Sequence, residues 1–242
     1  MTVERYTEGN YLEANPTWHE EDSPWKAEQI ARIVRDNRLA PKTVCEVGCG
    51  AGEILASLRK TFDDAKLVGY DVSPQAIARC EPKTARGLSF VQGDFLATVT
   101  ESFDLLLLID VFEHVDDYLG FLRALRTRAR HFVFHIPLDL HISSLARVSP
   151  LAEARAKIGH LHYFTRETAL ASLVDAGYRV VDEQYTAGGL ELDRRQLKTR
   201  LARLPRRIAY WINPHVAVRW LGGFSLLVLA ERDDAKSTKV GP

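Results

Sequence analysis

Short apolar runs alternate with amphipathic segments through most of the chain, and this alternation predicts an α/β protein. The expected strands are residues 43–47, 66–70, 88–91, 103–109, 131–136, 178–185 and 224–230. The run at 103–109 is dominated by leucine, as expected of a strand that is covered on both faces. Helical patterns lie between the runs, and the Ser23-Pro24 pair is typical of an N-cap followed by proline at the first helical position. The pattern therefore predicts a sheet with helices on both faces.

The first expected strand ends in a glycine-rich turn. Gly48, Gly50 and Gly52 stand at alternate positions, and an apolar helical pattern begins directly afterwards. Glycine permits positive φ and the close approach of a ligand, while a helix N-terminus presents free N–H groups and a partial positive charge. The turn therefore suits the anionic end of a ligand. A dinucleotide fingerprint would need glycine at position 53, where Glu53 would instead repel a pyrophosphate.

The segment from Glu46 to Gly52, E-V-G-C-G-A-G, resembles motif I of the class I S-adenosylmethionine (SAM) dependent methyltransferases. The resemblance implies a Rossmann-like sheet of seven strands in the order 3-2-1-4-5-7-6, with the last strand antiparallel. In this chain we expect inserts after strands 5 and 6. It also implies SAM as cofactor and S-adenosylhomocysteine as product. In this family the glycines pass the methionine part of SAM, and an acidic residue, here Glu46, anchors the network around its amino group. The alternative is an ordinary α/β turn without a ligand.

Further matches to the family follow the next two strands. Asp71 lies about 20 residues past Gly52, the interval at which an acidic residue meets the ribose hydroxyls in βαβ nucleotide folds. By the resemblance, Asp94 accepts from the adenine amine; as alternatives, Asp71 is only an N-cap and Gly93-Asp94 only a turn. The resemblance implies the cofactor-binding set Glu46, Gly48, Cys49, Gly50, Gly52, Asp71, Val72, Gly93, Asp94, Phe95, Ile109 and Asp110, with Val72 and Phe95 against the adenine.

The fourth strand is followed by D-V-F-E-H-V, an arrangement common among small-molecule methyltransferases of this class. It places Asp110 and His114 at the carboxyl edge of the sheet, where open α/β sheets bind ligands. His114 is the favoured general base, and its alternative role is to fix the loop by hydrogen bonding. His135 is expected to be packed and hydrogen-bonded. The expected catalytic residues are His114, Asp110 and His160, and the expected substrate contacts are His19, Trp25, Asp139, His141 and Tyr163.

The sequence predicts no metal site. A minority interpretation has Asp110 and Asp139 chelating Mg²⁺ beside a diol, but the adjacent Asp-Asn pair of the metal-dependent catechol type is missing. The cysteines, Cys45, Cys49 and Cys80, are expected to be reduced core thiols. The [D/N]-P-P-[Y/F] signature of enzymes that methylate nucleobase or glutamine nitrogens is also absent, which argues against DNA and protein amides as acceptors.

The expected organisation surrounds one core with additions. Residues 1–40 form an N-terminal lid and helix, residues 41–185 plus 224–231 the SAM-binding core, 138–160 an insert, 186–223 a basic helical insert and 232–242 a disordered tail. In the basic insert, Leu204, Ile208 and Trp211 fall at helical spacing among arginines, with Pro205 expected to kink or divide the helix. Such a segment packs on the body by its leucine stripe, lies on an anionic membrane through residues 194–211, or forms a homodimer or substrate-site cover.

Charge and composition narrow the function. Lys+Arg 32 against Asp+Glu 32 leaves no overall field toward nucleic acid, and no apolar stretch approaches a membrane helix of about 20 residues. The N-terminus has no signal-peptide core, so a cytoplasmic enzyme is expected. The resemblance implies methyl transfer to a hydroxyl or carboxyl of a small molecule such as a sugar or secondary metabolite. The alternatives are a SAM-fold protein without methyl transfer, acting as a cyclisation catalyst or partner subunit, and a membrane-associated methyltransferase with a lipid-linked acceptor.

Overall fold

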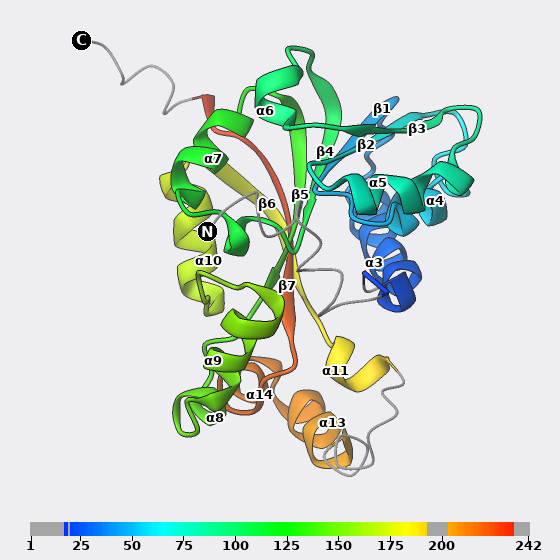
Figure 1. The fold of residues 1–242 in the computed structure, drawn as a ribbon. Coiled ribbons are helices and arrows are strands. Elements are labelled where there is room, and N and C mark those ends of the chain that lie inside the picture. Colours follow the sequence, from blue (N-terminus) through cyan, green and yellow to red (C-terminus); the bar gives the residue numbers. More distant parts are fainter. Residues whose placement is uncertain (1–16, 19, 193–202, 235–242) are drawn as a thin grey trace.

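The computed structural model describes residues 17, 18, 20–192 and 203–234, and its centre is a seven-stranded sheet (Figure 1). The strand order is β3-β2-β1-β4-β5-β7-β6, with β7 antiparallel to both of its neighbours, which confirms the expected topology. The strands are β1 (Thr43–Val47), β2 (Lys66–Asp71), β3 (Leu88–Gln92), β4 (Phe103–Ile109), β5 (Ala129–Pro137), β6 (Tyr178–Thr186) and β7 (Ser225–Arg232). Strands β1 to β5 are parallel, so their carboxyl ends share one edge.

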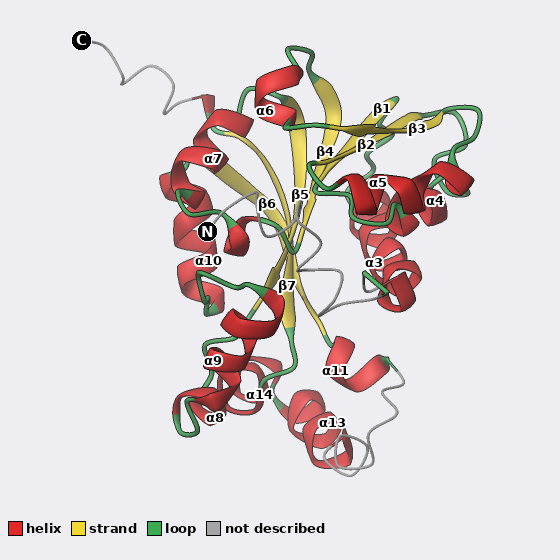
Figure 2. Cartoon of the chain, in the orientation of Figure 1, coloured by secondary structure: helices red, strands yellow, loops and turns green. Residues whose placement is uncertain are grey.

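Two apolar cores lie on the two faces of the sheet. Figure 2 shows helices on both sides of the strands. On β4, Leu106 and Leu108 join one core, while Leu105, Leu107 and Ile109 join the other, because successive side chains on a strand point to opposite faces. The helices around the sheet are α3 (Ser23–Asp36), α4 (Glu53–Leu58), α5 (Pro74–Cys80), α6 (Phe95–Thr98), α7 (Tyr118–Leu125) and α10 (Arg166–Asp175). Helices α3 and α4 cover one core, and α7 and α10 cover the other.

Short helical turns complete the layers. The 3₁₀ turns are η1 (Glu20–Asp22), η2 (Glu81–Lys83) and η3 (Phe112–His114), and η4 (Ala154–Ile158) is a π-helical turn. Because η1 runs directly into α3, the residue before that helix is Asp22, which makes no side-chain cap; the prediction of Ser23 as N-cap is therefore wrong. All three cysteines are buried and free of disulfides, as expected.

Both inserts leave the sheet at the edge where β1 to β5 end. The first contains α8 (Ile142–Leu145), α9 (Ser149–Glu153) and η4, and it follows β5. The second follows β6, which runs parallel to β5 because both are antiparallel to β7. It contains α11 (Gly188–Glu191), α13 (Arg203–Ile212) and α14 (Pro214–Leu221). Additions at this edge stand where ligands bind in open α/β sheets.

The second insert bears on two expectations. Pro205 lies in the first turn of α13, where a missing N–H costs little, and because positions 193–202 lie outside the described residues, a kink or division at Pro205 stays a prediction. A break comes at Asn213, whose side chain accepts from the Val216 N–H at 3.1 Å and caps α14. Leu204, Ile208 and Trp211 are exposed. The prediction that the basic insert packs on the body through these apolar positions is therefore wrong.

Several of the expected segments lie wholly or partly outside the residues that the structure describes. Most of the expected lid, His19, positions 193–202 of the basic insert and the tail from 235 onward lie outside the described residues. Arg232 belongs to β7, so the expected tail begins too early by that residue. No helix within the described part of the chain is both long and apolar enough to span a membrane.

Candidate active site

The turn after β1 is shaped by its three glycines. Gly48, Gly50 and Gly52 have φ of 72°, 53° and 77°, a region that side chains with a Cβ rarely adopt. A Cβ on Gly52 would lie 2.6 Å from the Phe90 ring, whereas a Cβ on Gly50 would meet only Trp18 at 3.7 Å. Gly52 is thus required for packing, and Gly50 is the position where the backbone is open to a ligand beneath Trp18.

Asp71 ties the end of β2 to this turn. One carboxylate oxygen accepts from the Gly50 N–H at 2.8 Å, and the other accepts from the Ser73 N–H at 2.8 Å. Burial raises the pKa of Asp71 to about 6, although the backbone N–H groups act in the opposite direction. The carboxylate therefore stands fixed beside the open glycine, as a group that accepts two ligand hydroxyls would need to.

Glu46 is the buried acid of the same motif. It is 1% exposed, and its Oε2 has no hydrogen-bond partner among the described residues. Burial, and then the neighbouring Cys80 thiol, raise its pKa well above the ordinary value. A buried acceptor without a donor is costly, so a ligand amino group at this point would supply what the protein lacks.

The other expected cofactor contacts differ in character. Asp94 is exposed and caps α6 by accepting from the Leu96 N–H at 2.9 Å. Phe95 is buried and packs edge-on against Tyr70, with ring centroids 5.4 Å apart, so its ring belongs to the core. Val72 is half-buried at the end of β2, and Ile109 belongs to the core beneath α3 and α4. Their contacts with a cofactor, and those of Gly48, Cys49, Gly52 and Gly93, stay predictions.

Asp110, directly after β4, is held between the Lys26 ammonium group and the His135 ring. Its carboxylate accepts from Lys26 Nζ at 2.7 Å and pairs with His135 Nδ1 at 2.6 Å, and His135 Nε2 lies 2.9 Å from Thr186 Oγ1. Burial alone would raise the pKa of Asp110, but the charges of His135 and Lys26 outweigh it and lower the pKa overall. Asp110 also has a φ of 55°, a strained value that this network maintains. His135 is hydrogen-bonded, as expected. The sequence did not indicate that Lys26 would contact Asp110 or that Thr186 would contact His135.

A second group of polar side chains follows the same strand. Glu113 and His114 lie in η3, and His160 lies in the segment that closes the first insert. His160 Nδ1 is 2.6 Å from an Asp139 carboxylate oxygen, and His114 Nδ1 is 3.1 Å from the Gly159 carbonyl. The two imidazole rings meet edge-on, with centroids 4.9 Å apart. The structure thus brings both expected histidines together with Asp139.

The remaining expected substrate contacts are engaged elsewhere. His141 Nδ1 accepts from the Ser144 N–H at 3.1 Å and caps α8. Tyr163 donates its hydroxyl to the Leu151 carbonyl at 2.9 Å, and Trp25 Nε1 donates to Glu191 at 2.7 Å. These bonds are structural, because each one joins segments of the inserts or α3, and a role of these residues in substrate binding stays a prediction.

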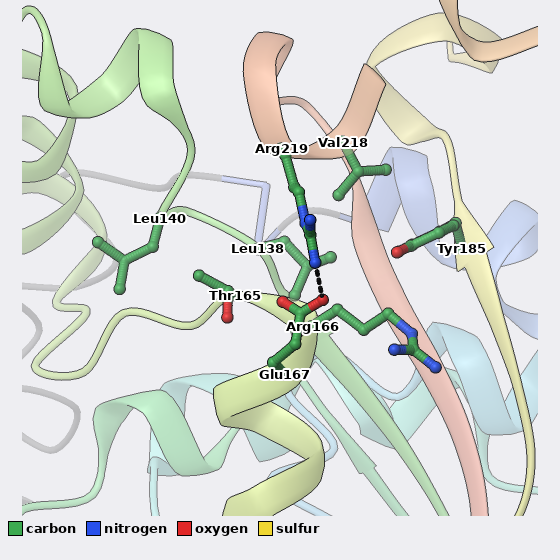
Figure 3. A pocket seen from close by; sticks show the side chains of 8 residues that line it. All are labelled: Leu138, Leu140, Thr165, Arg166, Glu167, Tyr185, Val218 and Arg219. Carbon is green, nitrogen blue, oxygen red and sulfur yellow. Dashed lines mark hydrogen bonds and ion pairs between the residues drawn. The ribbon is translucent and has the colours of Figure 1, made fainter. Parts of the chain in front are cut away.

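A small pocket lies where α10 begins, beside β6 and α14 (Figure 3). It is lined by Leu138, Leu140, Thr165, Arg166, Glu167, Tyr185, Val218 and Arg219. Arg219 crosses it and donates to Glu167 at 2.6 Å. None of the expected site residues lines this pocket. The ion pair across it joins α14 to α10.

A Rossmann-like sheet of this order with a glycine turn at the end of β1 defines the class I SAM-dependent methyltransferases. A family model described as a methyltransferase domain matches residues 18–183, and the chain belongs to this family.

The chain is also similar in part to one curated protein, and its fold is similar to solved structures. Over 63 residues the chain is 38% identical to trans-aconitate 2-methyltransferase of Deinococcus radiodurans, a match that covers 26% of this chain and 24% of that protein. The fold is similar to a chain of the complex between the Haloferax volcanii Trm112 activator and a methyltransferase (TM-score 0.66, 18% identity, 96% and 97% of the two chains). It is also similar to magnesium protoporphyrin IX methyltransferase from Synechocystis PCC 6803 with bound S-adenosylhomocysteine (TM-score 0.58, 15% identity, 86% and 83%).

Proposed function

We propose that this protein transfers the methyl group of SAM to a hydroxyl or carboxyl oxygen of a small molecule. The observation that carries the proposal is the pairing of His160 with Asp139 at 2.6 Å beside His114, at the edge where β4 and β5 end. A hydroxyl acceptor must lose its proton as it reacts, and imidazole groups can act on that proton near neutral pH. A carboxylate acceptor would need only positioning.

The residues around the glycine turn fit SAM. The unpartnered Glu46 oxygen suits its amino group, the open backbone at Gly50 suits its methionine part, and Asp71 suits its ribose hydroxyls. SAM supplies an electrophilic methyl on a sulfur that leaves as a neutral thioether. The acceptor oxygen then forms the new bond to the methyl carbon while the bond from carbon to sulfur breaks, so the protein mainly has to align the two partners.

The test is methyl transfer from labelled SAM to three groups of acceptors. The first contains sugar and secondary-metabolite hydroxyls, the second contains di- and tricarboxylates including trans-aconitate, which the D. radiodurans relative is named for, and the third contains protein and nucleic acid. Transfer to the first or second group supports the proposal. Transfer confined to the third group overturns it, and SAM binding without transfer to any of them favours the alternative of a cofactor-binding partner or cyclisation catalyst.

A second candidate is action on a lipid-linked acceptor at an anionic membrane, and the surface of α13 and α14 favours it. Trp211 is 86% exposed and Trp220 is 54% exposed, with Leu204, Ile208, Ile212 and Val216 also exposed beside them. No acidic residue occurs between 203 and 221, whereas arginines occur at 203, 206, 207 and 219. Exposed tryptophan with arginine and without acidic groups is complementary to an anionic lipid surface.

Cosedimentation with vesicles tests this second candidate. With phosphatidylserine–phosphatidylcholine vesicles, Arg207→Glu should weaken binding at least fivefold, since each basic group near such a surface contributes about 1 kcal/mol. Trp211→Ser should weaken it further, whereas Val181→Ser, at an exposed apolar position on β6, should not. Equal binding of all three variants, or equal binding to vesicles of phosphatidylcholine alone, would exclude the anionic-membrane interpretation.

A further inference from the structure

Three side chains with metal-ligating atoms meet after the end of β4. Glu113, His114 and His160 each offer one ligand atom, and these atoms all lie within 4.8 Å of one another. In the part of the chain that the structure describes, this is the one group of three or more such residues. Two segments of the chain build it, because the backbone carbonyl of Glu113 accepts from the N–H groups of Leu161 and His162 at 2.8 and 3.1 Å. The group is therefore held by backbone pairing and not by chance side-chain proximity.

Glu113 is the first sign that the group lacks a component. It is 0% exposed, and neither carboxylate oxygen has a hydrogen-bond partner among the described residues. A buried carboxylate is strongly disfavoured unless a donor or a cation satisfies it. Asp110 and Asp139 lie close enough to act on it as further negative charges, while its own backbone N–H and Lys26 act in the opposite direction. The surroundings therefore favour an added positive charge.

The histidines give the second sign. His160 faces the Asp139 carboxylate with Nδ1, and His114 faces the Gly159 carbonyl with Nδ1. Both partners are acceptors, so each ring presents its Nδ1 N–H to them, and Nε2 is the ring nitrogen that His160 can offer to a ligand. Histidines that bind metals show this arrangement, in which a carboxylate or carbonyl takes the N–H and fixes the tautomer and the ring orientation.

We propose that Glu113, His114 and His160 bind one divalent transition-metal cation, with Asp139 as the residue that orients His160. Two imidazoles and one carboxylate suit Zn²⁺ and similar ions better than Mg²⁺, which prefers oxygen ligands alone. Ligands about 2.1 Å from one ion lie up to about 4.2 Å apart, so the group has to contract by roughly half an ångström. Three protein ligands leave coordination positions for an acceptor oxygen, and this last point rests on the proposed function. An acceptor hydroxyl bound to the cation would lose its proton more easily, and this replaces the general-base role proposed above for the two imidazoles.

Metal binding can be measured without any acceptor. The full-length protein is stripped with a chelator, dialysed, and titrated with Zn²⁺, Co²⁺ and Mg²⁺ separately, with metal content by mass spectrometry and the visible ligand-field bands of Co²⁺ as readouts. One equivalent of Zn²⁺ or Co²⁺ should bind, with Mg²⁺ at least tenfold weaker. Glu113→Gln and His160→Gln should lose the Co²⁺ bands, and Asp139→Asn should lower Zn²⁺ affinity 10- to 100-fold.

The matched control is His162→Gln, since His162 lies two residues from His160 and donates from Nε2 to the Val115 carbonyl at 2.9 Å, outside the group. It should bind Co²⁺ as the unmodified protein does. Binding below about a tenth of an equivalent, or Co²⁺ bands unchanged in folded Glu113→Gln protein, would overturn the inference. The proposed function is judged separately. If the protein binds the metal but methylates no oxygen acceptor, the metal site stands and the proposed function is rejected. If metal-free and metal-loaded enzyme turn over an acceptor equally fast, only the catalytic role of the cation is rejected.

Discussion

The two halves of the carboxyl edge are built in different ways. The donor half, at the ends of β1 to β3, consists mostly of backbone: three glycines with positive φ and an aspartate that accepts from main-chain N–H groups. The acceptor half, at the ends of β4 and β5, consists of charged side chains brought together from distant segments. Lys26 and Asp110, for example, are 84 positions apart. A substitution in the donor half, which is made of local backbone, should leave the acceptor half unchanged. The geometry of the acceptor half, in contrast, requires that distant segments of the chain pack correctly.

This difference has an energetic side. The donor half leaves one buried acceptor, on Glu46, without a partner, and the acceptor half leaves both oxygens of Glu113 without one. In the described part of the chain, each half therefore contains a buried carboxyl group with unsatisfied hydrogen-bonding capacity, at a place where a ligand could satisfy it. The predictions below test whether the two halves respond to mutation as differently as they are built.

The largest effect is expected at Asp110. Asp110→Asn leaves Lys26 charged in a buried setting without its counter-ion, and should lower the unfolding free energy by roughly 3 to 5 kcal/mol near pH 7. Because the folded-state pKa of Asp110 is lowered, its stabilising contribution is complete above the ordinary value near 4 and is lost as the pH falls. The difference between variant and parent in urea unfolding should therefore shrink in acid.

Asp117→Asn is the control for that experiment. Asp117 caps α7 by accepting from the Gly120 N–H at 2.9 Å, and asparagine caps a helix about as well as aspartate. Its unfolding free energy should change by less than about 0.5 kcal/mol. A similar, small loss in both variants would mean that the contacts of Asp110 with Lys26 and His135 do not stabilise the acceptor half.

The donor half should be most sensitive at Gly52. Gly52→Ala combines a positive φ with a contact of 2.6 Å to Phe90, and should cost roughly 2 to 4 kcal/mol in thermal or urea unfolding. Gly50→Ala has the same backbone strain but open space, and should cost about 1 kcal/mol. Equal losses would contradict the assignment of Gly52 to packing and Gly50 to ligand approach.

The same contrast explains what the sequence could predict. The seven strands were predicted to within one or two residues of their observed bounds, and their order followed from the motif resemblance, because alternation of apolar runs and the glycine turn are local signals. The positions of the glycine turn, Glu46 and Asp71 could be predicted because each lies in or directly at the end of one of the first two strands. The D-V-F-E-H-V segment likewise placed Asp110 and His114 at the correct edge.

The partners in the acceptor half could not be predicted, because nothing in the spacing shows which distant segments meet. Lys26 is noticeable in sequence only as a charge in the first turn of a helix, yet the structure places it on Asp110. Glu113 was overlooked because its burial is decided by the segment that ends at His160. The exposed faces of α13 and α14 were ambiguous for a related reason: an amphipathic pattern does not say whether its apolar side meets the body or a partner.

A smaller effect is expected when the charge of Asp71 is removed. Asp71→Asn should weaken SAM binding by about 2 kcal/mol, or roughly 30-fold, because hydrogen bonds to a charged group are stronger than those to a neutral one. In the parent, SAM affinity measured by calorimetry should fall as the pH drops through about 6, since the neutral acid accepts less well from hydroxyls. A pH profile that is flat in the parent would show that Asp71 does not contact the cofactor.

The charge of Asp71 is expected to act on folding stability in the opposite direction from its effect on SAM binding. Because the folded-state pKa of Asp71 is raised by burial, its protonation favours folding below the ordinary value near 4, and this contribution is lost as the pH rises through about 6. At pH 7 removal of the buried charge favours the variant, whereas loss of the acceptor for one of the two backbone N–H groups disfavours it, so its unfolding temperature should differ from that of the parent by only a few degrees. An Asp71→Asn protein that loses both SAM binding and several kilocalories of stability would place Asp71 with Asp110, as a structural charge.

The smallest effect concerns the link between α3 and the second insert. Trp25 Nε1 donates to Glu191 at 2.7 Å, and its ring lies against Gly188 at the start of α11. A double-mutant cycle with Trp25→Phe and Glu191→Gln should give a coupling energy of about 1 kcal/mol in unfolding, because phenylalanine keeps the ring and loses the donor. SAM affinity should not change in either variant, since the pair lies apart from the glycine turn. A coupling energy near zero would show that the hydrogen bond between Trp25 and Glu191 does not stabilise the contact of α3 with α11, so that Lys26 would be the stronger link from α3 to the acceptor half.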